Sequence, residues 1–431
     1  MILAHGIGGR LDLPVPVSYF VVGAAFVVVL SFVALAVLWP RPRLQSGPRL
    51  SGRAARIPLE GFLAVLGLMA LLIVIGQLLP VVFGVNTDPT RPSIAPALVW
   101  IVMWLVVPFL AALIGDWYTF INPWRALARA TGVGKTERPE LLARAGVEPA
   151  VLLLIAFTWL ELISPRSGDP VMLGVAALAY TVLLMVVMAS FGRETGLAVF
   201  DFFTPYVRLI SAISPLGRDR RGRVRWRGWL RSLPVIPEWP GLWIFVVVMI
   251  GTVSYDGASG AVWFRNLVGD FGEGLIGQTV LLFVSVAVIG SAYWLACLAA
   301  AMSSDANVSA GVVAQRFAHT LVPIALAYAF AHYFTLVIFE GQQLLAAISD
   351  PFALGWDLFG SASRRVDFFI TAAEPIWYVQ VGSIVVGHVL GVVLAHDRAL
   401  FDFGGDAVRS QYAMLTLMVA LTSLGLFILA G

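Results

Sequence analysis

Long apolar runs separated by short polar connections dominate the chain, and several are near the roughly 20 residues that an α-helix needs to cross a bilayer. The pattern predicts an all-α, polytopic transmembrane helix bundle of about ten spans. Because 148–164 is short and 311–339 is long enough to tilt or to kink at Pro323, nine or eleven spans also fit. The runs lie near 18–39, 59–83, 93–115, 148–164, 170–191, 240–255, 275–302, 311–339, 375–396 and 411–430.

Composition supports the membrane interpretation. Of the 431 residues, 59% are apolar and only 12% are charged, and the mean hydropathy of +0.89 lies outside the range of soluble domains. Helices side by side in lipid form one body, so we expect a single domain over residues 1–431. The chain's one cysteine, Cys297, excludes an intramolecular disulfide and a cysteine metal cluster.

The distribution of basic residues predicts the orientation, because Lys and Arg accumulate on the cytoplasmic side of a membrane. With the N-terminus outside, 22 of the 28 basic residues fall in cytoplasmic connections. This split favours an even number of spans and both termini outside. The run "RDRRGRVRWRGWLR" at 218–231 then lies just below a span, which favours anionic lipid headgroups over nucleic acid as its partner.

A weak internal repeat follows the third and fifth predicted spans. Asp116 begins "DWYTFINPWRALARATG" and Asp201 begins "DFFTPYVRLISAISPLG", and both copies share two aromatic residues and a threonine. Each copy suits a helix lying in the cytoplasmic interface, near 117–131 and 199–215. Duplicated broken segments also mark the substrate sites of many transporters, so both interpretations remain open.

Three histidines lie within predicted spans. His319 and His332 occur in "RFAHTLVPIALAYAFAHYF", and His388 lies close to Gly387 and Gly391 in a small-residue stripe that allows another helix to approach. Because His319 and His332 are roughly 20 Å apart along one helix, they cannot bind one ion together. Any shared site must join different helices.

Further polar residues lie toward the predicted outer ends of these spans: Glu340, Glu374 and Gln380. Ionisable groups inside a bilayer are costly and normally face a cavity or a partner, so they are candidates for a substrate or proton path together with His319, His332 and His388. The alternative is that the histidines are hydrogen-bonded between helices as structural contacts.

Histidine chemistry leaves several roles open. Imidazole can relay protons, bind zinc or copper, or hold a haem between two helices, with His332 and His388 as the candidate metal ligands. The sequence has no phosphate-binding glycine loop, no His-Glu-x-x-His and no Gly-x-Ser-x-Gly motif. No connection is long enough for a soluble catalytic domain, so any enzyme would act inside the bundle or at its mouth.

Several segments resemble bacterial membrane proteins commonly labelled fenitrothion hydrolase: "AHGIGGRLDLPVPVSYFVVGAAFVVVLSFVALAVLW", "GDWYTFINPWRALA", "FAHTLVPIALAYAFAHYF" and "WYVQVGSIVVGHVLGVVLAHDRAL". The similarity extends along most of the chain and implies location in the bacterial cytoplasmic membrane. The label implies cleavage of an organophosphate triester, which usually requires a metal-activated water. His332, Glu340 and Glu374 could supply ligands for such a metal.

Two functional hypotheses follow. The first is a transporter or permease for a small solute or ion, favoured by the span number, the repeat and the intramembrane His, Glu and Gln residues. The second is a membrane-embedded metal-dependent hydrolase or a haem or copper redox protein, favoured by the histidines and by the resemblance. Oligomeric state and partner subunits cannot be read from the sequence.

Overall fold

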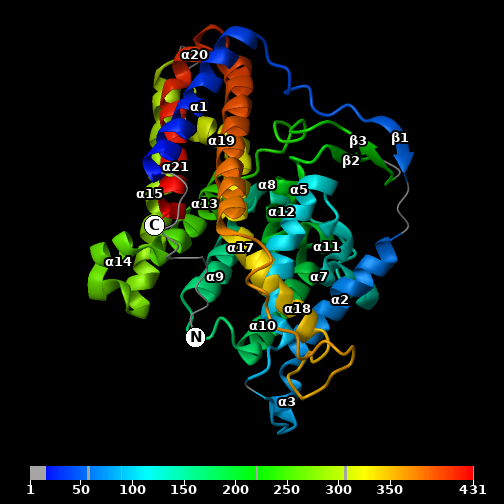
Figure 1. Cartoon of the computed structure of the whole chain (residues 1–431). Helices are drawn as coiled ribbons and strands as arrows, with labels where there is room; N and C mark the ends of the chain where they lie inside the picture. The colour runs from blue at the N-terminus through cyan, green and yellow to red at the C-terminus, as the bar shows by residue number, and fades with distance from the viewer. Residues whose placement is uncertain (1–15, 56–58, 89, 220–221, 305–307, 431) are drawn as a thin grey trace.

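Long apolar helices form almost the whole structure, a computed structural model that describes residues 16–55, 59–88, 90–219, 222–304 and 308–430 (Figure 1). Within these residues, nine helical segments are long and apolar enough to cross a membrane, which fits a multi-pass membrane protein. Those nine are Val17–Leu38, Glu60–Val82, Ile94–Ile114, Pro170–Phe191, Leu242–Gly260, Leu275–Met302, Ala310–Ala347, Ala373–Ser410 and Tyr412–Ala430.

Among the described residues, nine candidate segments match nine of the ten expected spans and lie within the expected range of nine to eleven. The segment predicted at 148–164 is the helix α9 (Glu148–Leu162), which has 15 residues. At 1.5 Å per residue it is roughly 22 Å long, shorter than the roughly 30 Å of a bilayer's hydrocarbon core. Packed against the central helix α13 (Leu242–Gly260), α9 is partly enclosed by protein.

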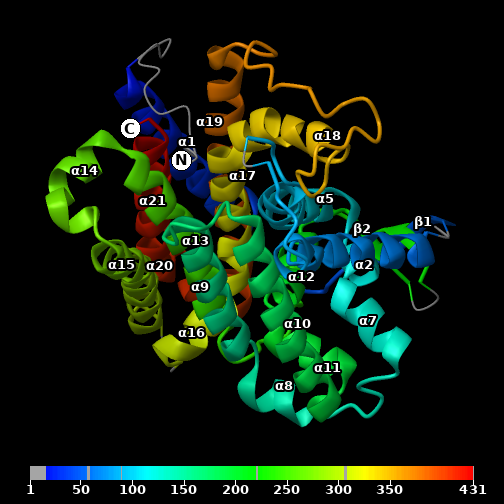
Figure 2. The same ribbon diagram turned by 90° about the horizontal axis from the view of Figure 1, so that it is seen from below.

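Two groups of helices flank a central pair (Figures 1 and 2). The central pair is α13 and α17 (Val322–Phe339), and α13 is the most deeply buried of the nine candidate spans. One flanking group comprises α1 (Val17–Leu38), α15 (Leu275–Met302), α19 (Ala373–Phe403) and α21 (Tyr412–Ala430). The other comprises α2 (Glu60–Gly76), α5 (Val107–Ile114), α7 (Pro123–Thr131), α10 (Pro170–Phe191) and α12 (Phe203–Ser211).

Short helical elements connect or extend these helices. The α-helical ones are α3 (Leu79–Val82), α4 (Ile94–Pro96), α6 (Tyr118–Ile121), α8 (Glu140–Ala145), α11 (Arg193–Phe200), α14 (Val262–Val268), α16 (Ala310–Phe317), α18 (Gln343–Ala347) and α20 (Ala407–Ser410). Those of 3-10 type are η2 (Gly269–Gly272), η3 (Ala318–Leu321), η4 (Glu340–Gln342) and η5 (Gly404–Asp406).

The small-residue stripe on α19 lies where α17 approaches most closely. A Cβ atom added at Gly387 would lie 2.3 Å from the Cβ of Ala327 and 2.8 Å from the carbonyl oxygen of Pro323. At Gly391 it would lie 3.0 Å from the carbonyl oxygen of Thr320. The expected close helix contact is therefore confirmed for these two glycines, because only a residue without a side chain allows this backbone separation.

The third span contains a π-helical section, η1 (Ala97–Val106), between α4 and α5. Pro108 has no N–H to donate to the carbonyl of Trp104, so the regular i to i−4 pattern cannot pass this point. The N–H of Val107 instead donates to the carbonyl of Val102, five residues earlier. Such sections often lie at functional sites, and Trp104 belongs to this one.

A small antiparallel sheet joins connections far apart in sequence, with strand order β1-β3-β2. The strands are β1 (Ser51–Ala55), β2 (Leu216–Arg218) and β3 (Val224–Trp226). Ser51 lies opposite Trp226, and β2 and β3 pair from Leu216 with Trp226 to Arg218 with Val224. Part of the basic run at 218–231 is thus a hairpin strand, which apolar periodicity does not predict.

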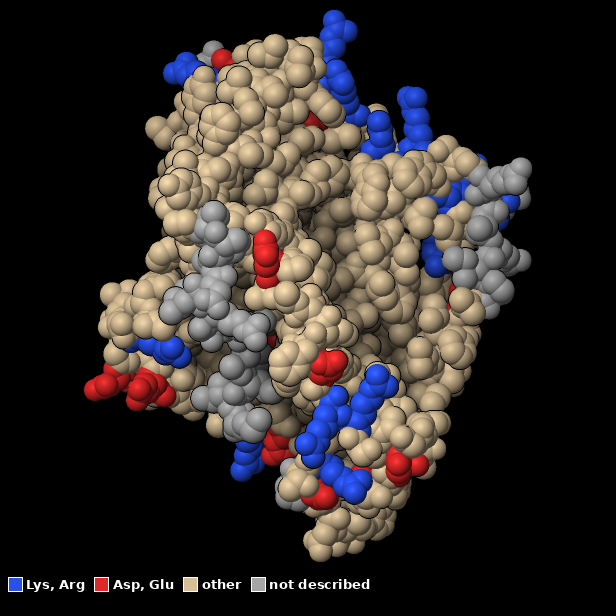
Figure 3. All heavy atoms as spheres, in the orientation of Figure 1, with Lys and Arg blue, Asp and Glu red and all other residues tan. Residues whose placement is uncertain are grey.

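The segments expected as two interfacial helices differ from each other. In the first, α7 buries Pro123, Trp124, Arg125 and Ala128 and exposes its last three residues, so it lies at the protein surface. In the second, seven of the nine residues of α12 are buried, so α12 packs inside the protein. On the face drawn in Figure 3, Lys and Arg gather toward the two ends, and few charged side chains occupy the band between them.

Candidate functional site

His332 and Asp256 make the central polar contact between the spans. His332 on α17 places Nε2 2.8 Å from Oδ2 of Asp256 on α13. Because a carboxylate oxygen accepts, the ring Nε2–H donates. The side chain of Asp256 is 6% exposed and that of His332 is 16% exposed. This pair therefore connects a buried carboxylate to a histidine that reaches the protein surface.

Two more elements extend this contact into the protein. Tyr333, next to His332, lies against both Asp256 and Glu161, and Glu161 is near the end of α9. The indole of Trp104 on η1 lies against Glu161 and Tyr333. We call His332, Asp256, Tyr333, Glu161 and Trp104 the His332 network. Four separate helical segments thus contribute polar groups to one buried cluster.

Incomplete hydrogen bonding is the chief chemical feature of the His332 network. Glu161 is only 5% exposed, and its Oε2 atom makes no well-formed hydrogen bond among the described residues, although the side chains of Trp104 and Tyr333 lie beside this carboxyl group. The indole Nε1 of Trp104 faces the same carboxyl group and likewise makes no well-formed hydrogen bond among the described residues. A buried polar atom left unsatisfied costs about 1–3 kcal/mol, and such atoms are rare in native proteins. The cluster thus has capacity for a proton, an ion or a water molecule at Glu161.

The local sequence explains how these groups meet. Gly257 follows Asp256 on α13, and a Cβ atom at this position would lie 3.5 Å from Nδ1 of His332 and 2.4 Å from Ile428. A glycine here lets α13, α17 and α21 converge. On α19, Gln380 donates from Nε2 to the carbonyl of Ala331 at 2.7 Å, so it holds the backbone beside His332. Gln380 and His332 therefore lie at a similar height along the two neighbouring helices.

The other two intramembrane histidines bond to their own helices. His388 is fully buried and donates from Nδ1 to the carbonyl of Ile384 at 2.8 Å. His319 donates from Nδ1 to the carbonyl of Arg316 at 2.9 Å. In both rings Nε2 has no hydrogen-bond partner among the described residues. Neither belongs to the His332 network, and the ring beside His388 is that of Tyr328 at 5.8 Å.

The remaining predicted site residues are dispersed. Glu340 in η4 accepts a hydrogen bond from Nε2 of Gln343, and Glu374 in the first turn of α19 is exposed. The described residues contain no group of three or more His, Cys, Asp or Glu that could hold a metal ion. His332, Glu340 and Glu374 are therefore not assembled as a metal site, and His332 and His388 belong to no such group.

A second buried polar cluster surrounds Asp397, near the other end of α19. This carboxylate is fully buried and accepts hydrogen bonds from Nε1 of Trp39 at 3.0 Å, from Nε2 of Gln45 at 2.9 Å and from the backbone N–H groups of Arg43 and Leu44. We call Asp397 and these four donors the Asp397 network. It fixes the connection after α1 onto α19.

His396 lies beside the Asp397 network and is buried, although its sequence context suggests a histidine at the membrane surface. Its Nδ1 and Nε2 atoms lie 3.1 Å from Oε1 of Gln411 and from the carbonyl of Trp39. Arg398, the residue after Asp397, donates to Asp402 at 2.8 Å and to Glu238 at 3.1 Å. Arg398 therefore bridges two carboxylates, one on α19 and one in the connection before α13.

The two repeat segments share a local turn. Thr119 donates from Oγ1 to Asp116 at 2.8 Å, and Thr204 donates from Oγ1 to Asp201 at 2.7 Å. Asn122 from the first segment also donates to Asp201 at 2.9 Å, which links the two segments. Burial raises the pKa of Asp201 above its ordinary value, although the hydrogen bonds that it accepts act in the opposite direction.

Sequence reasoning named only His332 among the members of this network and did not pair it with the two acidic members, Glu161 and Asp256. Both are single acidic residues near the ends of apolar segments, "FTWLELI" and "GTVSYDG", where an acid ordinarily marks the beginning of a loop. In the structure the helix continues past each acid, and α13 ends four residues after Asp256. Both acids therefore belong to helices and not to loops. Comparison with protein-family models, curated proteins and solved structures gives no match for the chain.

Proposed function

We propose that the chain is a proton-coupled transporter of a small solute or ion. The observation that carries the proposal is the His332 network, in which a partly exposed histidine contacts a buried carboxylate that continues to a second carboxyl group. Ionisable residues within membrane helices are costly and mark ion pathways or proton relays. His332 would exchange protons with the surface, and Asp256 and Glu161 would hold them inside.

The broken helices give further support. The third candidate span includes the π-helical section η1, and the seventh changes from α16 through the 3-10 turn η3 to α17. Irregular backbone inside a bundle is typical of transporter sites, because it exposes backbone groups that can hold a solute. Trp104 on η1 and His332 on α17 bring both irregular spans to the same network.

A metal-dependent hydrolase or a redox protein receives less support. Cleavage of a phosphate triester by metal-activated water needs about three protein ligands around one ion. No such group exists among the described residues, and Nε2 of His332 is engaged with Asp256. Chelation with EDTA should therefore leave transport unchanged.

Proteoliposomes containing a pH-sensitive dye test the proposal. Purified protein is reconstituted, and monovalent cations, divalent cations and small organic anions are added outside in turn. At least one class should change the internal pH with wild-type protein, because solute movement is coupled to protons. Asp256→Asn should abolish this change, whereas Asp270→Asn, which alters an exposed carboxylate, should preserve it. The proposal fails if no class gives a wild-type signal, or if Asp256→Asn matches wild type.

A further inference from the structure

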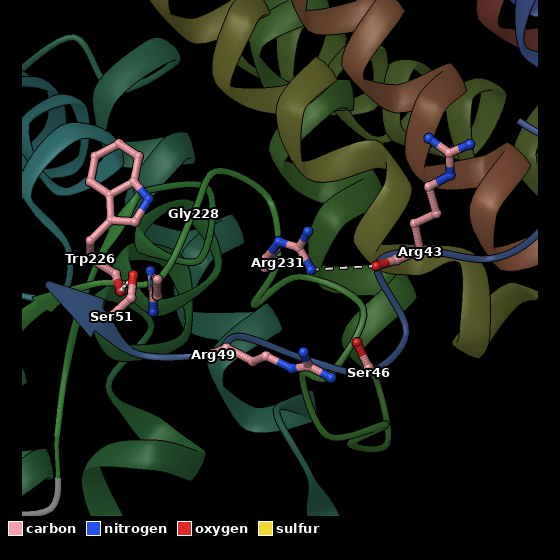
Figure 4. A pocket seen from close by; sticks show the side chains of 8 residues that line it. Arg43, Ser46, Arg49, Ser51, Trp226, Gly228 and Arg231 are labelled. Carbon is pink, nitrogen blue, oxygen red and sulfur yellow. Dashed lines mark hydrogen bonds between the residues drawn. The ribbon is translucent and has the colours of Figure 1, made fainter. Parts of the chain in front are cut away.

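Two basic connections meet in a cavity at the small sheet (Figure 4). The connection between α1 and β1 contributes Arg43, Ser46 and Arg49 to its wall. Trp226 at the end of β3 and Arg231 in the segment that follows contribute from the other side. The cavity has a volume of about 430 Å³, which lies within the range of small-molecule sites.

The cavity is strongly positive. Arginines line it and no acidic residue does, and within the described part of the chain Arg43, Arg49 and Arg231 form no ion pair. Two of the lining arginines differ. The guanidinium of Arg43 lies over the Trp39 ring, 4.6 Å from its centroid, and that of Arg227 donates inward to the carbonyls of Ser211 and Ser214. Uncompensated guanidinium groups near hydroxyls favour an anion with several acceptor oxygens.

Surrounding contacts hold this wall in place. The Asp397 network fixes Arg43 through its backbone N–H, and pairing of β1 with β3 holds Ser51 opposite Trp226. Nη1 of Arg231 lies 3.5 Å from the carbonyl oxygen of Arg43, and Figure 4 shows this contact across the cavity. Two parts of the chain more than 180 residues apart are thus joined at the site.

Backbone strain marks the same turn. Leu230, immediately before Arg231, has φ of 62°, one of two non-glycine residues with positive φ among the described residues. For a leucine this conformation costs roughly 1–2 kcal/mol. A Cβ atom at Gly228 would approach Cδ of Arg231 to 3.2 Å. The turn therefore adopts a strained backbone conformation that places the Arg231 side chain at the cavity.

We propose that this cavity binds a phosphate ester, carried either by an anionic lipid headgroup or by a small soluble molecule. The guanidinium groups of Arg49 and Arg231 would bind the phosphate oxygens, and the hydroxyls of Ser46 and Ser51 would donate further hydrogen bonds. The predicted orientation puts the cavity on the cytoplasmic face, where anionic lipid headgroups concentrate. The site is separate from the His332 network and does not depend on proton transport.

The test uses full-length protein in phosphatidylcholine nanodiscs with two probes. Isothermal titration calorimetry measures binding of glycerol 1-phosphate, and native mass spectrometry measures retention of phosphatidylglycerol. The double variant Arg49→Gln/Arg231→Gln should weaken binding at least about tenfold, because it removes two charged hydrogen-bond donors. The matched control Arg364→Gln/Arg365→Gln removes two exposed arginines elsewhere and should change binding less than about twofold.

Each outcome supports or contradicts a phosphate site in this cavity. Selective loss of glycerol 1-phosphate binding in the double variant supports the site with a soluble ester as its ligand. Selective loss of phosphatidylglycerol alone supports the site with a lipid as its ligand. If neither probe binds wild-type protein, or if both double variants lose binding equally, the cavity is not a phosphate site and general surface charge explains any attraction.

Discussion

The His332 network and the Asp397 network are both buried among helices, yet they differ in how fully their polar atoms are satisfied. Asp397 is fully buried and accepts from four donors on the connection after α1. In the His332 network, Oε2 of Glu161 and Nε1 of Trp104 make no well-formed hydrogen bond among the described residues, although the two side chains lie beside each other.

This difference separates structural from functional polar groups. A carboxylate that accepts hydrogen bonds from several donors holds the chain around it in place. A buried carboxyl oxygen without a well-formed hydrogen bond can gain a proton or a ligand at little cost in existing hydrogen bonds. We therefore assign the Asp397 network to stability and the His332 network to transport, and the following variants test that assignment.

Asp397→Ala should have the largest effect on stability. It leaves four donors without their acceptor inside the protein, and loss of one partner from a buried charged contact costs about 3–5 kcal/mol. Thermal unfolding in detergent can be followed by thiol labelling, because Cys297 is the chain's one cysteine and is buried. Glu273→Ala removes an exposed carboxylate and should change the unfolding free energy by less than about 0.5 kcal/mol. Equal melting temperatures for the two variants would show that Asp397 is not a structural residue.

Gly387→Ala should have the next largest effect, because it alters the α17–α19 contact that supports Gln380 and His332. The new Cβ atom would lie 2.3 Å from the Cβ of Ala327, so the helices must separate, at a cost of about 1–3 kcal/mol. Gly382→Ala on the same helix meets nothing within 4 Å. It should be neutral or stabilise by up to about 1 kcal/mol through better helix propensity. Identical thermal shifts for both variants would contradict close helix packing at Gly387.

Glu137 provides a smaller effect with a defined pH dependence. Burial acts to raise the pKa of this carboxyl, but hydrogen bonds from the backbone N–H groups of Glu194 and Thr195 and from the Thr195 hydroxyl outweigh it and lower the pKa. A lowered pKa in the folded state gives stability that is present above the unfolded-state pKa and lost as pH falls through the folded-state value.

Glu137→Gln should therefore cost about 1 kcal/mol at neutral pH, as loss of a helix N-terminal cap does. Tryptophan fluorescence during thermal unfolding measures the difference between wild type and variant at each pH. The difference should shrink as the pH drops below the ordinary range of glutamate. A difference that persists unchanged in acid would show that the charge of Glu137 is not what stabilises α11.

Glu161→Gln should have the smallest effect on stability, within about 1 kcal/mol, because it breaks no saturated set of hydrogen bonds. The same unfolding assay as for Asp397→Ala measures it. A loss as large as that of Asp397→Ala would make Glu161 a structural residue and end the distinction between the two networks.

The sequence predicts most of this architecture because apolar run length is a local property. The nine candidate spans follow the predicted apolar runs, and the glycines at 387 and 391 lie at the predicted helix contact. The sheet could not be predicted, because β1 pairs with a strand about 170 residues later and each strand is short.

The site was only partly predictable for a related reason. His332 stands out in an apolar helix, but its partner Asp256 lies 76 residues earlier and Glu161 lies on a third helix. Only helix packing decides which of several intramembrane polar residues meet. It also separates His319 and His388 from His332, although all three share the same kind of apolar surroundings in the sequence.

The most direct test of the central claim compares proton movement through wild-type protein and Glu161→Gln in the same dye-loaded proteoliposomes. With the solute class that drives wild-type protein, the initial rate of internal pH change should fall at least about tenfold in Glu161→Gln while its melting temperature stays close to that of wild type. Equal initial rates in the two proteins would show that protons do not pass through the His332 network.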